Sequence, residues 1–77
     1  MKLREARRRR FYSATDLAEE AGVSAATIYA IETGRELPVL RTARKLAAAL
    51  EVDPLQVDEF RAALERLSGA RIEAPAN

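Results

Sequence analysis

The stretch that decides the fold of this chain runs from Asp16 to Gly34 and reads DLAEEAGVSAATIYAIETG. Its apolar residues recur at helical spacing on both sides of a central glycine; they are Leu17, Ala18, Ala21, Ile28 and Ile31. Gly22 is a strong helix stop, and Ser24 can cap a new helix because its hydroxyl accepts a hydrogen bond from a free backbone N–H. The stretch therefore predicts two short helices joined by a sharp turn, the second over Ala25–Thr33.

The rest of the chain is also expected to be helical. Alanine, leucine, arginine and glutamate dominate, and no alternating strand pattern persists. The other four helices are expected over about Lys2–Arg10, from Ser13 to Gly22, over about Leu40–Leu50, and from Asp53 to Ser68. We expect the Leu40–Leu50 helix to face the core through Leu40, Ala43, Leu46, Ala47 and Leu50. The fold class is thus all-α with five helices.

Two start signals mark the second and fifth of these helices. Ser13 and Asp16 have the spacing of a capping box, in which each side chain accepts from the other residue's backbone N–H. Asp53-Pro54 supplies an N-cap acid and a proline at the first helical position, and Gln56 is placed to reach back as in a capping box. We therefore expect one domain over residues 1–69, followed by a mobile, polar tail over residues 70–77.

Composition excludes several kinds of chemistry. The 77 residues include no cysteine and no histidine, so neither thiolate metal ligands nor the commonest acid and base is present. The acidic pairs Glu19-Glu20 and Asp58-Glu59 have the character of solvated helix faces. We expect no enzyme activity, no metal and no cofactor. The apolar runs are too short for a membrane span or a secretory signal, so a cytoplasmic location is expected.

Charge is segregated along the chain although the formal net charge is only +1. Residues 1–10 contain six basic residues and one acidic residue, whereas residues 51–77 contain six acidic residues and three arginines. The basic end has two interpretations: it faces phosphate groups, or it is simply the solvated face of the first helix.

One set of residues recurs in a known order and spacing over residues 2–57: Arg7, Ser13, Leu17-Ala18, Gly22-Val23-Ser24, Thr27-Ile28, Ile31-Glu32, Gly34, Pro38, Leu46-Ala47, Leu50 and Val52. In this pattern the chain resembles the Cro/lambda-repressor-type (XRE-like) helix-turn-helix family. The resemblance implies a compact five-helix domain that binds double-stranded DNA, with the second helix of the motif in the major groove.

The resemblance also implies which residues contact DNA. The residues expected to face the bases are Ala25, Ala26, Thr27, Tyr29 and Ala30. Those expected at phosphates are Ser13, Ala14, Arg35, Arg41 and Arg10. Three of the base-facing residues are alanine, where the family commonly has long polar side chains that hydrogen-bond to base edges. Alternatively, the alanines serve only as helix formers and Tyr29 is a surface aromatic residue.

Three further positions carry structural expectations from the same resemblance. Arg7 and Glu32 match a partly buried ion pair between the first helix and the second helix of the motif. At Ala14 the family often has a glutamine, so only the backbone amide remains to bind phosphate. Phe11 stands where the family usually has a glycine. A positive φ there would be strained, and we expect Phe11 to pack against its own domain.

The apolar stripe of the last helix bears on oligomerisation. It either completes the core of the monomer or forms a twofold seam with a second copy. We expect Val57 in the core and Phe60, Leu64 and Leu67 at a dimer seam. A homodimeric repressor that covers a palindromic operator is the function that the resemblance favours. The alternative is a protein-interaction module on the same fold, including an antitoxin-type partner-binding role, with weakened DNA readout.

Overall fold

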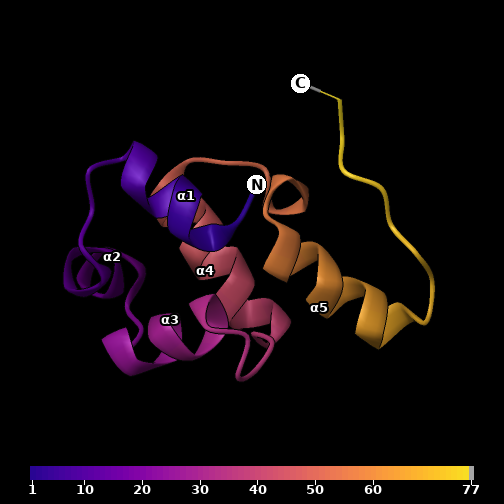
Figure 1. Cartoon of the computed structure of the whole chain (residues 1–77), viewed down its shortest axis with the longest axis horizontal. Helices are drawn as coiled ribbons and strands as arrows, with labels where there is room; N and C mark the ends of the chain where they lie inside the picture. The colour runs from indigo at the N-terminus through magenta and orange to yellow at the C-terminus, as the bar shows by residue number, and fades with distance from the viewer. Residues whose placement is uncertain (77) are drawn as a thin grey trace.

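The computed structural model describes residues 1–76 and consists of five α-helices and one 3₁₀ turn (Figure 1). In chain order these are α1 (Leu3–Arg9), α2 (Ala14–Ala21), α3 (Ala25–Glu32), α4 (Leu40–Leu50), η1 (Pro54–Gln56) and α5 (Asp58–Ser68). Within residues 1–76 there is no β-strand, and the all-α class predicted from the sequence is confirmed.

The boundaries of α2 and α3 follow from their capping residues. The Ser13 hydroxyl accepts a hydrogen bond from the Asp16 amide at 3.0 Å, and the Asp16 carboxylate accepts one from the Ser13 amide at 3.2 Å, which completes the capping box. Gly22 ends α2 with a φ of +72°, a left-handed conformation that glycine adopts without steric cost. The Ser24 hydroxyl then accepts from the Thr27 amide at 3.1 Å and starts α3. These local signals fix the turn between the two helices.

The hydrophobic core joins all five helices. Its largest fully buried side chains are Leu3, Leu17, Ile28, Ile31, Leu46, Leu50 and Val57. Phe60 belongs to the same core and is only 2% exposed. The expectation that Phe60 lies at a dimer seam is therefore wrong, because its ring is already used to close the monomer. Leu40 also differs from the expectation: it is 40% exposed at the start of α4 and does not face the core.

The region from Asp53 to Val57 departs from the expected continuous fifth helix. Asp53 does act as a cap, since its carboxylate accepts a hydrogen bond from the Leu55 amide at 2.9 Å. The turn it starts ends at once, because Val57 is extended (φ −101°, ψ 121°) and fully buried. Gln56 does not complete a capping box; its side chain donates to the Pro75 carbonyl at 3.2 Å. Burial of Val57 thus separates η1 from α5.

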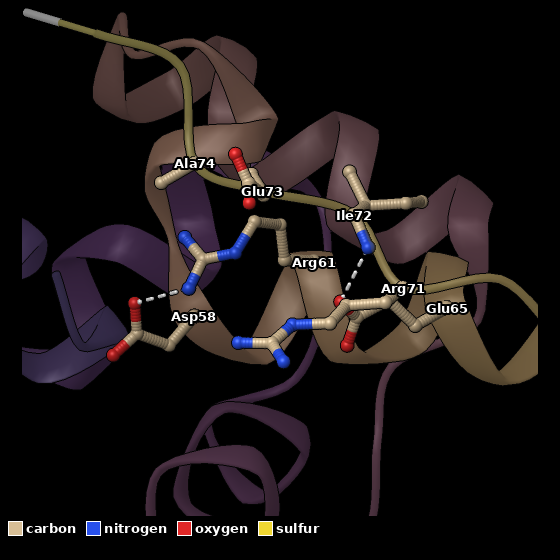
Figure 2. Close-up of a pocket in the computed structure, with 7 residues that line it drawn as sticks. All are labelled: Asp58, Arg61, Glu65, Arg71, Ile72, Glu73 and Ala74. Atoms are coloured by element: carbon tan, nitrogen blue, oxygen red, sulfur yellow. Dashed lines mark hydrogen bonds and ion pairs between the residues drawn. The ribbon is translucent and has the colours of Figure 1, made fainter.

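Residues 70–76 turn back along α5 toward η1 (Figure 1). The Ile72 amide donates to the Glu65 carboxylate at 2.7 Å. Between this segment and α5 lies a polar hollow of about 440 Å³, where Arg61 points toward Asp58 (Figure 2). Mobility of the tail stays a prediction, and Asn77 lies outside the described residues. No helix in residues 1–76 is long and apolar enough to cross a membrane.

Candidate nucleic-acid interface

The outer face of α3 is the surface that the sequence predicts to contact DNA. Ala26 is exposed, Tyr29 is 52% exposed, and Ala25 and Thr27 are half-buried. Ala30 is only 9% exposed, because it faces the loop that follows α3. The expectation that Ala30 points toward bases is therefore wrong, because its side chain is largely buried and does not project from the surface.

The hydroxyl groups of α3 are largely used inside the domain. The Thr27 and Ser24 hydroxyl oxygens are 2.8 Å apart, so one of them donates to the other. The Thr33 hydroxyl donates to the Tyr29 carbonyl at 2.8 Å. The Tyr29 hydroxyl has no hydrogen-bond partner within residues 1–76. This face therefore presents mainly methyl groups and one phenol to the outside.

A shallow hollow of about 330 Å³ lies beside α3 and is lined by Ala26, Thr27, Ala30, Arg35 and Glu36. The chain folds back over the end of α3, where the Arg35 amide donates to the Ala30 carbonyl at 2.9 Å. This places the exposed Arg35 side chain directly beside the outer face of α3. Arg35 and Glu36 carry opposite charges, so the rim of the hollow is close to neutral.

The expected phosphate contacts differ in what their side chains can do. Ser13 uses its hydroxyl in the α2 cap, and Ala14 is 2% exposed, so of Ala14 only the backbone amide is placed to face a phosphate. Arg10 is bound to Glu51 at 2.6 Å, which partly neutralises it. Arg41 is exposed on α4 and makes no ion pair within residues 1–76. Of the arginines expected at phosphates, Arg35 and Arg41 are thus the two that no ion pair within residues 1–76 neutralises, and their contact with phosphate stays a prediction.

An ion cluster holds α3 against α1. The Arg7 guanidinium donates two hydrogen bonds to the Glu32 carboxylate, at 2.7 and 2.9 Å, and a third to the Tyr12 carbonyl at 3.1 Å. The Glu32 side chain is fully buried, and that of Arg7 is 11% exposed. Burial raises the pKa of Glu32, but hydrogen bonds and charge from Arg7 and Arg4 outweigh it and hold this pKa below the ordinary 4.5.

Arg4 is the member of this cluster that the sequence reasoning missed. Its side chain lies 3.3 Å from Glu32 and is 50% exposed. Arg4 precedes Arg7 by three residues, and residues three apart share a helix face, so helical spacing could have identified it. Glu32 is thus compensated by two cations, one buried and one at the surface.

Phe11, between α1 and α2, has a left-handed backbone (φ +57°) and a side chain that is 95% exposed. A positive φ at this position is the strained conformation that the substitution of glycine by Phe11 raised in the sequence analysis. The ring does not pack against the domain, so that part of the expectation is wrong. The left-handed turn is held by two backbone hydrogen bonds, from the Phe11 amide to the Arg8 carbonyl at 2.9 Å and from the Tyr12 amide to the Arg7 carbonyl at 3.2 Å, which is the usual pattern at a helix C-terminus.

A second surface lies where the loop after α3 meets α5. Here an apolar groove of about 550 Å³ is lined by Pro38, Val39, Leu40, Ala63, Arg66 and Leu67. Leu67 is 71% exposed and Val39 is 69% exposed. Leu64 is half-buried. Of the three residues expected at a dimer seam, only Leu67 lies fully on the surface. It shares the groove with four apolar residues that were not expected at a seam: Pro38, Val39, Leu40 and Ala63.

Helices α2 and α3 both begin at a capping residue and are joined by a sharp turn. Arg7 of α1 binds Glu32 on the inner side of α3, and the outer side of α3 is exposed. This is the geometry of a domain that places a helix in a DNA groove. The family model described as "Helix-turn-helix domain" matches residues 1–60. The chain therefore belongs to the helix-turn-helix domain family, a class of DNA-binding domains. The search of curated proteins and the search of solved structures found no match.

Proposed function

We propose that this protein is a cytoplasmic transcription regulator that binds double-stranded DNA sequence-specifically and acts as a dimeric repressor by occupying its operator. The observation that carries this proposal is the outer face of α3. Between the capped start at Ser24 and the cation Arg35, this face leaves Ala26 exposed and Tyr29 52% exposed.

In this mechanism the two kinds of contact have different roles. Ala25, Ala26, Thr27 and Tyr29 lie toward base edges, whereas Arg35 and Arg41 neutralise phosphates. The buried Arg7–Glu32 pair fixes the orientation of α3, so that the reading surface is already formed before DNA binds. A rigid surface loses less conformational entropy on binding.

The apolar groove supports the dimeric part of the proposal. Leu67 and Val39 are exposed apolar side chains on neighbouring elements, and a twofold interface buries the same patch of both copies. Dimerisation here would set two copies of α3 on one side of the DNA, about 34 Å apart, and would require a palindromic operator. Phe60 has no part in this interface because it is buried in the core.

Selection of duplexes from random DNA tests the DNA-binding part. The selected duplex is then titrated at several salt concentrations with the wild type, with Arg35→Ala and with Arg71→Ala as a matched control on the tail. Arg35→Ala is expected to weaken binding to all sequences and to reduce the slope of log K against log salt by about 1. Arg71→Ala should leave the slope unchanged. If no duplex is enriched, the proposal is wrong.

Sedimentation at tens of micromolar tests the dimer. The wild type is expected to sediment as a dimer and Leu67→Glu as a monomer, because the new carboxylate would be desolvated in an apolar interface. Ala48→Glu, which adds the same charge on the exposed side of α4, is the control and should stay dimeric. A wild type that is monomeric throughout this range contradicts the dimeric mechanism.

The same groove favours a second candidate function, a protein-interaction module on the same fold with weakened DNA readout, which includes an antitoxin-type role in binding a partner protein. An exposed apolar groove is a common docking surface for another protein. This function replaces the first one if the duplex selection fails while the folded protein is intact.

A further inference from the structure

We propose that α3 reads its operator chiefly through the methyl group at carbon 5 of pyrimidine bases, carried by thymine or by 5-methylcytosine. This inference rests on the proposed function and specifies which feature of the DNA that function recognises. It follows from the chemistry that the outer face of α3 offers to a groove.

Helix α3 lacks the residue types that usually hydrogen-bond to base edges. The helix reads AATIYAIE and contains no arginine, lysine, asparagine or glutamine, the residues that pair bidentately with guanine or adenine in the major groove. Its one charged residue, Glu32, is fully buried in the ion cluster. An exposed amide or cationic side chain able to pair with a base edge is therefore absent from α3.

The threonine hydroxyl groups within and directly after α3 make hydrogen bonds inside the domain. Thr27 shares a hydrogen bond with Ser24 at the cap, and Thr33 donates to the backbone of its own helix. A hydroxyl that already makes one hydrogen bond within the domain keeps fewer free positions for a base and is held in one orientation by its partner. Tyr29 has the one hydroxyl of α3 without a partner in the described chain.

The groups of α3 that remain exposed are mainly apolar. The Ala26 methyl group and the half-exposed Tyr29 ring project from the same helix, three residues apart and therefore on neighbouring turns of one face. Apolar groups of this size match the pyrimidine 5-methyl group, which is the apolar feature of the major groove. A hollow lies beside Ala26 and is also lined by Thr27, Ala30, Arg35 and Glu36, so a protruding methyl group that enters it would lie next to two alanine side chains.

The test uses the wild-type protein and its selected duplex. Each thymine under α3 is replaced singly by uracil, which removes only the methyl group and keeps all hydrogen-bonding atoms. We expect a loss of affinity of about fourfold for each contacted methyl group, the equivalent of about 0.8 kcal/mol for one buried carbon. Uracil at positions outside the half-sites is the control and should have no effect.

A second arm distinguishes the two sources of the methyl group. Where the selected site has cytosine under α3, replacing it by 5-methylcytosine is expected to raise affinity by about the same fourfold if that position is a methyl contact. If only thymine positions respond, thymine is the natural source.

The protein side of the contact is tested with Ala26→Gly and with Tyr29→Ala. Ala48→Gly on the exposed face of α4 controls for the helix-destabilising effect of glycine. Each α3 variant is expected to reduce the ratio of thymine to uracil affinity from about fourfold to about one at the base it contacts, and Ala48→Gly should keep the ratio.

Different results contradict the proposed DNA-binding function and the inference that α3 reads methyl groups. If no duplex is enriched, the proposed function itself is wrong. If a duplex is enriched and bound tightly, but uracil has no effect at any position or both α3 variants retain the full thymine preference, the methyl-reading inference is overturned while DNA binding stands.

Discussion

Replacing Glu32 by glutamine is the most informative perturbation of this fold. The change is isosteric and removes only the negative charge that faces Arg7. The Arg7 guanidinium is 11% exposed and is held by two hydrogen bonds to Glu32. In Glu32→Gln a nearly buried cation keeps its place without a counter-charge, so the domain should lose stability.

The size of the loss can be worked from the burial of the two groups. Removing one partner of a buried ion pair costs about 3 to 5 kcal/mol, because the remaining charge is desolvated without compensation. Arg7 retains some exposure and its bond to the Tyr12 carbonyl, so we expect a loss of about 3 kcal/mol, at the lower end. A chain of this length has a total stability of about 4 to 12 kcal/mol, so the loss is a large share.

Urea denaturation followed by far-UV circular dichroism measures the change in unfolding free energy. The control is Glu5→Gln, which removes a carboxylate that also binds an arginine, Arg9 at 2.8 Å, but at the surface with 49% and 64% exposure. An exposed pair of this kind contributes at most about 0.5 kcal/mol. The comparison is thus between a buried carboxylate bound by two arginines and an exposed carboxylate bound by one.

The reasoning is refuted if Glu32→Gln costs no more than Glu5→Gln. A double-mutant cycle with Arg7→Ala then separates the pair from other effects. If the two residues interact as the structure shows, the double variant should lose clearly less than the sum of the two single losses.

Two other predictions concern acid stability and the α1–α2 loop. Because the folded pKa of Glu32 lies below its ordinary 4.5, its contribution to stability is complete above 4.5 and is lost as the pH falls through the folded pKa. The stability gap between wild type and Glu32→Gln should therefore narrow as the pH is lowered below 4.5, and a gap independent of pH would contradict this assignment. Phe11→Gly should stabilise the domain by about 0.5 to 1 kcal/mol in urea denaturation, because relief of a left-handed backbone exceeds the entropy cost of glycine. Phe11→Ala, which keeps the strain and removes only a 95% exposed ring, should be neutral, and a clear loss in either variant would mean that the ring packs in solution.

Much of the fold could be read from local sequence signals. The Ser13–Asp16 capping box, the left-handed Gly22 and the Ser24 cap act within one turn of helix, so each depends only on residues a few positions away. The same holds for the periodic apolar face of α4, whose bounds match the expected Leu40–Leu50. The site helix, its turn and the fold class were therefore predictable before any tertiary contact was known.

The sequence by itself determined where α2, α3 and α4 begin and end, because caps and helix stops act over a few residues of the same segment. The start of α5 is an exception, because the burial of Val57 ends η1 and sets it. Only the tertiary structure decided the environment of individual side chains. It buried Phe60 and Ala30, and it brought Arg4 to Glu32. It also gathered Val39 and Leu67, 28 residues apart, at one groove. The periodic pattern predicted the buried face of α4, but these contacts join segments that are distant in sequence and meet only when the core closes, so no local pattern encodes them.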